Sequence, residues 1–261
     1  MSNSVLFSAF KRPQAGIQLV FLHHAGSSCF SYMELASKLS ESADIYCLEL
    51  AGRGMRAAEP FQTDAEAVLS EILAAINHLK LGDDKPLLLF GHSLGAELAY
   101  QVARRLECES PNKKFALIIS ARGFVHPEGL KSEPCEAYSD DYVLNVIEQC
   151  NGTPSEVFSD TEMRNYLINI MRHDLVLLDS LSRLPKVNLN AQVWVIGGNQ
   201  DRRVSAAQLS DWSRVLSASV EHKLFTGGHF YLFNNDVVLS WLEKEARALA
   251  QEVKVKETEE K

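Results

Sequence analysis

The sequence predicts an α/β fold in which a mostly parallel sheet carries helices on both of its faces. Short apolar runs of strand character alternate along the chain with longer segments whose apolar residues recur every three or four positions. The short runs are continuously apolar, which is typical of parallel strands that are covered on both faces. With 261 residues, 46% of them hydrophobic, the chain can build a large core, so we expect residues 1–250 to form a single domain.

Strands and helices are expected to alternate as in a series of βαβ units. The strands are predicted at residues 17–22, 44–48, 86–90, 115–120, 192–197 and 220–224. The main helices are predicted at residues 32–39, 64–79, 94–106, 206–216 and 236–250. Thr63 is followed three residues later by Glu66, which predicts a capping box at the start of the second helix.

The alternation stops between about residues 123 and 184. Two helical patterns, at 140–149 and 161–181, follow one another there with only a turn at residues 151–154 between them. We interpret this segment as a helical lid inserted on top of the sheet, where it would shape a substrate pocket, with an extra pair of packing helices as the alternative. The last segment, 251–261, is charged and poor in anchoring residues, which predicts a disordered tail.

Composition and charge argue against several classes of protein. The formal net charge is -8, and no basic stretch with interleaved aromatic residues appears, so nucleic acid is not an expected partner. The apolar runs end well short of the roughly 18 residues that span a bilayer, and the first ten residues lack the features of a signal peptide. The five cysteines form no metal-ligand spacing, which predicts free thiols. We therefore expect a cytoplasmic protein without a metal or cofactor, and a monomer, because no interface motif is evident.

The segment LLLFGHSLGAELA, residues 87–99, carries the first indication of chemistry. A strand-like run ends in the pattern G-x-S-x-G, and a helix-forming segment follows at once, which is the arrangement of a nucleophile elbow. The pattern alone is weak, since glycine and serine are common enough to give on the order of one chance match in ten chains of this length. Its place between a strand and a helix makes Ser93 the candidate nucleophile.

A serine hydroxyl needs a general base beside it and a third group that orients the base. In the α/β-hydrolase arrangement the acid follows a late strand and the histidine follows the last strand. Asp201 and His229 occupy these places, after the strands predicted at 192–197 and 220–224. Asp174 is the alternative acid, although it lies inside a helical pattern. We therefore predict a catalytic triad of Ser93, Asp201 and His229.

The transition state of acyl transfer also needs backbone donors for its oxyanion. The first is expected from the residue after the nucleophile, Leu94, and the second from the loop that follows an early strand. In the segment FLHHAGSS, residues 21–28, small residues let the backbone approach a substrate closely, and Ala25 is the candidate donor. The alternative is that this segment is an ordinary turn between a strand and a helix.

Several motifs together resemble the type II, or editing, thioesterases that accompany nonribosomal peptide and polyketide synthases. They are HAG at residues 24–26, AGRGMR at 51–56, GHSLGA at 91–96, MRHD at 171–174, Asp201 after its strand, and GGHF at 227–230. The resemblance covers roughly residues 16–245. The chain departs from the usual pattern at His23 and Ala51, where proline is common, and at Ser27, where a second glycine is usual.

This resemblance implies an α/β-hydrolase fold and the hydrolysis of acyl thioesters on the phosphopantetheine arm of carrier protein domains, which would be transient partners. The role implied is removal of misprimed or stalled acyl groups, with no cofactor. A thiol with a pKa of about 8.5 leaves more readily than an alcohol, which fits this chemistry. The alternatives are a carboxylesterase for small oxyesters, a chain-terminating thioesterase, and a binding module that has lost its catalytic apparatus.

Four charged residues of these motifs have open roles. Arg53 and Arg56 would either meet the acidic face of a carrier protein or pair with acidic side chains of this chain, and we favour pairing. Arg172 and Asp174 are interpreted as a pair that anchors the lid.

Overall fold

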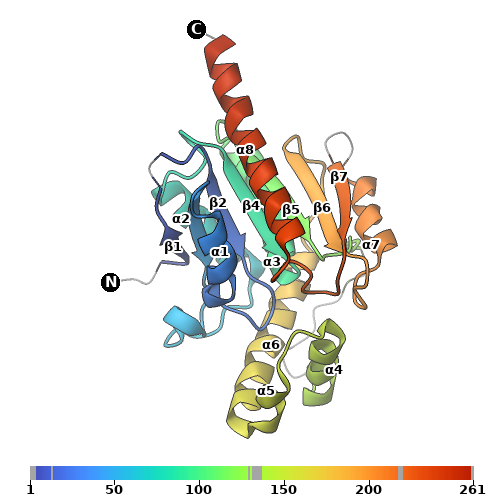
Figure 1. The fold of residues 1–261 in the computed structure, drawn as a ribbon. Helices are drawn as coiled ribbons and strands as arrows, with labels where there is room; N and C mark the ends of the chain where they lie inside the picture. Colours follow the sequence, from blue (N-terminus) through green and yellow to red (C-terminus); the bar gives the residue numbers. More distant parts are fainter. Residues whose placement is uncertain (1–3, 13, 129, 131–136, 217–219, 260–261) are drawn as a thin grey trace.

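A seven-stranded sheet forms the centre of the molecule and is covered by helices on both faces (Figure 1). The computed structural model describes residues 4–12, 14–128, 130, 137–216 and 220–259. The strand order is β1-β3-β2-β4-β5-β6-β7. All neighbouring strands are parallel except β1 and β3, which are antiparallel. The predicted fold class, α/β with a mostly parallel sheet, is confirmed.

The six predicted strands form within one or two residues of their expected bounds. They are β2 (Gln18–Leu22), β3 (Asp44–Leu48), β4 (Leu87–His92), β5 (Phe115–Ser120), β6 (Gln192–Gly198) and β7 (Val220–Phe225). The prediction missed β1 (Leu6–Phe10), an edge strand with only its first residue fully buried. A strand of this kind lacks the continuous apolar run that marks the central strands. The sheet combines strands from the first and the last parts of the described chain, and the single domain stays a prediction.

Helices flank the sheet where the apolar periodicity predicts them. Their bounds are α1 (Met33–Leu39), α2 (Ala65–His78), α3 (Leu94–Glu109), α7 (Ala206–Ser210) and α8 (Asp236–Glu259), with short 3-10 turns η1 (Cys29–Tyr32), η2 (Gly54–Arg56) and η4 (Asp211–Arg214). On one face, α2, α3 and part of α6 pack against the sheet, and on the other face α1 and α8 do so. None of the described helices has both the length and the apolar character needed to cross a bilayer.

The start of α2 and the end of α8 both differ from the sequence prediction. The predicted capping box does not form, because Asp64 is the N-cap of α2 and accepts a hydrogen bond from the backbone N–H of Ala67. Asp64 offers the same kind of acceptor one residue later than Thr63. α8 continues to Glu259, beyond its predicted end at residue 250, while the disorder predicted for residues 251–261 stays a prediction. This segment contains neither glycine nor proline, so nothing in its sequence ends the helix.

The helical insertion predicted at about residues 123–184 is present between β5 and β6. It contains α4 (Asp140–Cys150), α5 (Ser155–Ser159) and α6 (Thr161–Ser182), and its described residues include no strand. Figure 1 shows α4 and α5 beyond the carboxyl ends of the central strands, below the sheet in this view. Residues of α4 and α6, including Val143, Ile168 and Met171, form a separate apolar cluster, which we call the lid core. Further along α6, Leu177 and Leu181 join the main core, so this helix ties the lid to the sheet.

Candidate active site

The predicted catalytic residues lie in loops at the carboxyl ends of three strands. Ser93 follows β4, Asp201 follows β6 and His229 follows β7. In the sheet, β4 and β6 flank β5, and β7 pairs with β6 in parallel. Because the carboxyl ends of parallel strands meet at one edge of a sheet, all three loops open on the same side.

The turn around Ser93 has the geometry of a nucleophile elbow. Ser93 has φ 56° and ψ -113°, a backbone conformation that non-glycine residues rarely adopt, and α3 begins at the next residue. A Cβ on Gly91 would lie 2.0 Å from the carbonyl oxygen of Gly95, and a Cβ on Gly95 would lie 2.0 Å from that of Leu22. Only glycine therefore fits at either position. Leu94 is the first residue of α3, where a backbone N–H has no partner within the helix.

Asp201 and His229 form a buried hydrogen-bonded pair. His229 Nδ1 donates to Asp201 Oδ2 over 2.8 Å, and the two side chains are 2% and 1% exposed. The other carboxylate oxygen accepts from the backbone N–H of Arg203 and Val204. Burial alone raises the pKa of Asp201, but hydrogen bonds from His229 and from the two backbone groups outweigh it, so the pKa is lowered. The result is an ionised carboxylate that fixes the orientation of the imidazole.

His229 also faces the elbow and the lid. Its ring centroid lies 5.1 Å from that of His92, the residue before Ser93. Among the described contacts there is no hydrogen bond between Ser93 and His229, and such bonds are often long before substrate binds. Burial by itself lowers the pKa of His229, but hydrogen bonds to Asp201 and to the Cys150 thiol raise it to about 9. Cys150 is the last residue of α4, so the lid contacts the candidate base, which no sequence motif indicated.

Within the described residues, the loop after β2 leaves the backbone N–H of Ala25 free beside the elbow. The carbonyl oxygen of His24 accepts from His23 Nδ1 over 2.9 Å and from the backbone N–H of Ser27 over 3.3 Å. The N–H of Gly26, which has φ 76°, donates to Asp174 Oδ2 over 2.8 Å. In the described part of the chain, the N–H of Ala25 has no hydrogen-bond partner. The N–H of Ala25, the donor candidate from the sequence, is therefore available to an oxyanion.

Comparison with known proteins identifies the family. A model of the thioesterase domain family matches residues 17–245, which is most of the chain. The chain belongs to the thioesterase domain family. Its fold is similar to that of the type II thioesterase BorB from the borrelidin biosynthetic cluster, with a TM-score of 0.78 and 26% identity over 94% of this chain and 100% of that one.

Two curated relatives of this thioesterase come from streptomycetes. The probable cadicidin biosynthesis thioesterase of Streptomyces griseus is 27% identical over 216 residues, which are 83% of this chain and 58% of the relative. This chain thus spans less than two thirds of that protein. The thioesterase PikA5 of Streptomyces venezuelae is 27% identical over 220 residues, covering 84% of this chain and 77% of the relative.

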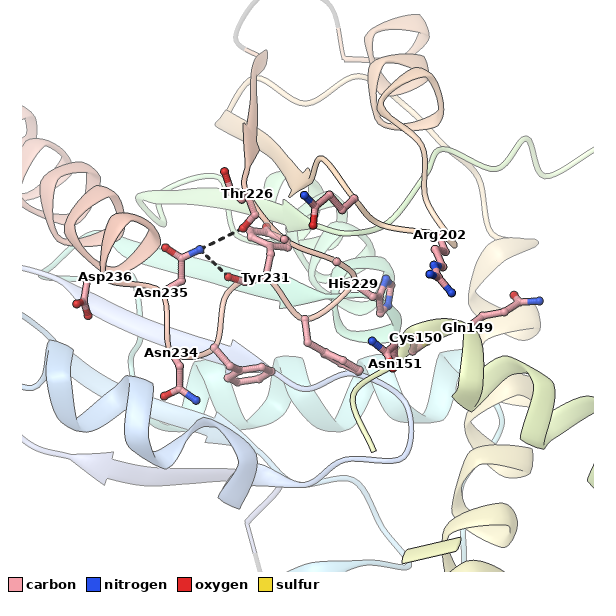
Figure 2. A pocket seen from close by; sticks show the side chains of 15 residues that line it. Gln149, Cys150, Asn151, Arg202, Thr226, His229, Tyr231, Asn234, Asn235 and Asp236 are labelled. Carbon is pink, nitrogen blue, oxygen red and sulfur yellow. Dashed lines mark hydrogen bonds between the residues drawn. The ribbon is translucent and has the colours of Figure 1, made fainter. Parts of the chain in front are cut away.

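A cavity of about 790 Å³ opens beside His229 of this thioesterase (Figure 2). Side-chain amides dominate its polar lining, and they come from Gln149, Asn151, Gln200, Asn234 and Asn235. Phe230, Tyr231 and Phe233 supply its apolar wall, and Arg202 and Asp236 are its charged members. The lid contributes the segment around Cys150, so the end of α4 forms one side of the opening.

The arginines of the thioesterase motifs pair with acidic side chains, as we favoured for Arg53 and Arg56. Arg56 pairs with Glu59 and Glu71. Arg53 makes a two-pronged ion pair with Asp174 at 2.6 Å for each contact. The predicted Arg172–Asp174 pair is therefore wrong: Arg172 pairs with Asp140 and donates to the carbonyl oxygen of Tyr138. Residues two apart on a helix point to different sides, which explains why they do not meet.

Asp174 and His92, two further residues near the site, each have contacts that point to a structural role. Asp174, the alternative acid, binds Arg53 and Gly26, and its described contacts include no bond to His229. His92 Nδ1 is hydrogen-bonded to Ser120 over 2.8 Å, and burial lowers its pKa well below the ordinary value. His92 is thus a neutral structural residue. In the described ranges, no group of three or more His, Cys, Asp or Glu side chains is arranged to hold a metal ion.

Proposed function

We propose that this protein is a type II thioesterase that hydrolyses acyl thioesters on the phosphopantetheine arm of carrier protein domains. In this role it removes misprimed or stalled acyl groups and binds its carrier partners transiently. The observation that carries the proposal is the buried Asp201–His229 pair, which lies against an elbow where Ser93 has a positive φ. The names of the relatives and of the similar structure, which are thioesterases of biosynthetic systems, support it.

In the proposed mechanism Ser93 Oγ attacks the thioester carbonyl while His229 Nε2 takes the hydroxyl proton. Asp201 holds the imidazolium through Nδ1, and the N–H groups of Leu94 and Ala25 donate to the oxyanion. The tetrahedral intermediate collapses, the carbon–sulfur bond breaks, and His229 returns the proton to the leaving pantetheine sulfur. A water molecule, deprotonated by His229, then attacks the acyl-serine; the acyl–oxygen bond breaks, His229 returns the proton to Ser93 Oγ, and the acid is released.

The cavity beside His229 supports a pantetheine thioester over a simple lipid ester. Pantetheine is an uncharged chain with two amide groups, and each amide both donates and accepts hydrogen bonds. The side-chain amides that line the cavity can satisfy such groups, whereas they would be poor neighbours for a fatty chain. We therefore place the arm in this cavity, with its sulfur at the end that His229 forms.

The test is hydrolysis of defined substrates by purified protein. Carrier proteins loaded with acetyl, propionyl, aminoacyl and long acyl groups are incubated with the wild type and with Ser93→Ala, and free acid is measured. We expect release by the wild type and a loss of at least about 10³-fold in the variant. Matched oxyesters serve as the comparison. Release of acid that persists in Ser93→Ala would contradict the proposed mechanism, and a preference for oxyesters would favour the carboxylesterase alternative.

A further inference from the structure

A buried ion pair joins the lid to the loop after β3, and both of its members hydrogen-bond to the loop that carries Ala25. Asp174 lies on α6, and Arg53 lies in the loop after β3; their side chains are 1% and 3% exposed. Arg53 Nη1 and Nη2 each contact one carboxylate oxygen of Asp174 at 2.6 Å. The same Asp174 Oδ2 accepts the N–H of Gly26 over 2.8 Å, and Arg53 Nη1 donates to the carbonyl oxygen of Ser27 over 3.3 Å. Both charges are thus in direct contact with backbone beside Ala25.

These contacts fix the peptide groups on both sides of Ala25. Asp174 holds the N–H of Gly26, which belongs to the Ala25–Gly26 peptide. The carbonyl of His24, held by His23 and Ser27, belongs to the His24–Ala25 peptide. In a planar trans peptide the N–H points away from the C=O, so fixing the His24 carbonyl also sets the direction of the Ala25 N–H. The direction of this donor is therefore set by the contacts of the His24 carbonyl, and Asp174 and Arg53 hold the next two residues of the same loop.

The lid helix packs on the same loop. A Cβ on Gly26 would lie 2.6 Å from the sulfur of Met171 and 3.2 Å from Leu167 Cδ1, both residues of α6. Asp174 follows Met171 on that helix by three residues, which places both side chains on neighbouring positions of one face. The loop is therefore held by α6 through the hydrogen bond between Gly26 and Asp174 and through the apolar side chains of Met171 and Leu167, so a shift of α6 would move Gly26 with it.

We infer that Asp174 and Arg53 are positioning residues that aim the Ala25 N–H at the oxyanion, so that the lid helix α6 helps to set the rate of acyl transfer. This inference rests on the proposed function, since it assigns a task within that mechanism. Neither residue touches the reacting atoms; each acts through the backbone of residues 24–27. Their loss should therefore affect the transition state and leave ground-state binding of substrate intact.

The test compares Asp174→Asn and the double variant Arg53→Met/Asp174→Leu with the wild type. In Asp174→Asn the charge of Arg53 stays buried without its partner, which can prevent folding. The double variant removes both charges and provides the test if the single variant does not fold. For acyl-pantetheine hydrolysis we expect kcat to fall by about 10²–10³-fold, the loss typical of a missing oxyanion donor, with KM within about twofold. The control Asp140→Ala breaks the other lid ion pair, Arg172–Asp140, and should leave kcat within about twofold.

Inhibitor binding separates positioning from a merely structural role. A trifluoromethyl ketone analogue of the acyl group forms an oxyanion with Ser93, whereas a thioether analogue, with a methylene in place of the carbonyl, does not. We expect the ketone affinity to fall by the same factor as kcat and the thioether affinity to stay unchanged. The inference is overturned if a folded variant keeps its kcat, or if both analogues lose affinity in parallel.

A second substrate distinguishes a failure of the positioning role from a failure of the proposed function. Hydrolysis of p-nitrophenyl acetate also passes through an oxyanion but contains no thioester or pantetheine. If the wild type cleaves this ester and not acyl-pantetheine, the proposed function fails while the positioning role is still measured. If both substrates are cleaved and the variants match the wild type on both, the positioning role fails alone.

Discussion

His229 contacts an acidic side chain on one side and a thiol on the other, and this environment determines the pH at which it can act as a base. Its pKa is raised to about 9 by hydrogen bonds to Asp201 and Cys150, against the effect of burial. A general base must be neutral, so kcat/KM should rise with pH and reach half of its plateau near pH 9. The measurement is the pH–rate profile of p-nitrophenyl acetate hydrolysis across neutral and alkaline pH.

Cys150→Ala should move this profile to lower pH. The variant removes one of the interactions that raise the pKa of His229, so a larger fraction of the imidazole is neutral at pH 7 and the rate there should increase. Cys108→Ala is the matched control, because Cys108 is an exposed thiol near the end of α3. An unchanged or more alkaline midpoint in Cys150→Ala would contradict the assigned contact.

At the residue scale, sequence reasoning worked where a residue follows a recognisable strand. Ser93, Asp201 and His229 each lie within a few positions of the end of an apolar run, so chain order alone was enough to propose them. The Arg53–Asp174 pair joins residues 121 positions apart, and neither residue's neighbours indicate its partner. Contacts of this kind depend on how the lid docks, which no local pattern encodes.

At the scale of elements, the start of α3 depends on the absence of a side chain at Gly95. Alanine is normally better than glycine in a helix by about 1 kcal/mol. At Gly95, however, a Cβ would lie 2.0 Å from the carbonyl oxygen of Leu22, a backbone atom that cannot rotate away. We expect Gly95→Ala to destabilise the protein by about 1–3 kcal/mol in urea unfolding. In the control Gly228→Ala, whose Cβ would have no neighbour closer than 4.0 Å, stability should change little.

The lid should be able to loosen independently of the sheet. Val143 of α4 is fully buried, yet its neighbours belong to the lid core and not to the main core. Val143→Ala should therefore speed hydrogen exchange of the α4 amides and leave the strands unchanged. Val102→Ala in α3 removes the same atoms from the main core and should weaken the whole molecule by roughly 1–3 kcal/mol. If Val143→Ala accelerates exchange in β4 and β5 as well, the lid and the sheet unfold together.

Element prediction succeeded for buried strands and failed at edges and ends. Burial on both faces gave β4 and β5 unbroken apolar runs, whereas β1 lies at the sheet edge with four half-buried residues. The N-cap of α2 was predicted at Thr63, one residue before its position at Asp64, because both side chains are good acceptors for an unpaired helix N–H. Packing decides between such equivalent choices, and packing is not visible in a local pattern.

At the scale of the whole molecule, buried histidines make stability depend on pH. Burial is the main cause that lowers the pKa of His23 to about 3, and it lowers the pKa of His92 well below the ordinary value; both side chains are 0% exposed. In the unfolded chain the same side chains titrate near pH 6.5. Below that pH the unfolded state binds more protons than the folded state, so the free energy of unfolding decreases as pH falls from 6.5 toward 3.

His229 has the opposite dependence. Its folded pKa of about 9 lies above the unfolded value, so the stability that it contributes is complete below about pH 6.5 and is lost as pH rises through 9. The two kinds of histidine together predict a maximum of stability near neutral pH. Each neutral buried histidine removes about 1.4 kcal/mol per pH unit on the acid side, so His23 and His92 together remove about 3 kcal/mol per unit. His24, whose pKa burial also lowers to about 3, adds to this slope.

Because a domain of this kind is stable by only about 5–15 kcal/mol, we expect unfolding within a few pH units below neutrality. The measurement is the free energy of unfolding in urea at a series of pH values. His23→Gln keeps a side-chain donor for the His24 carbonyl and cannot titrate. The free energy of unfolding should therefore fall less steeply below neutral pH, by the contribution of one histidine. His126→Gln is the control, because His126 is exposed and should leave the slope unchanged. A stability that stays constant from pH 6.5 to pH 5, or an equal slope in His23→Gln, would show that His23 takes up its proton in the folded state.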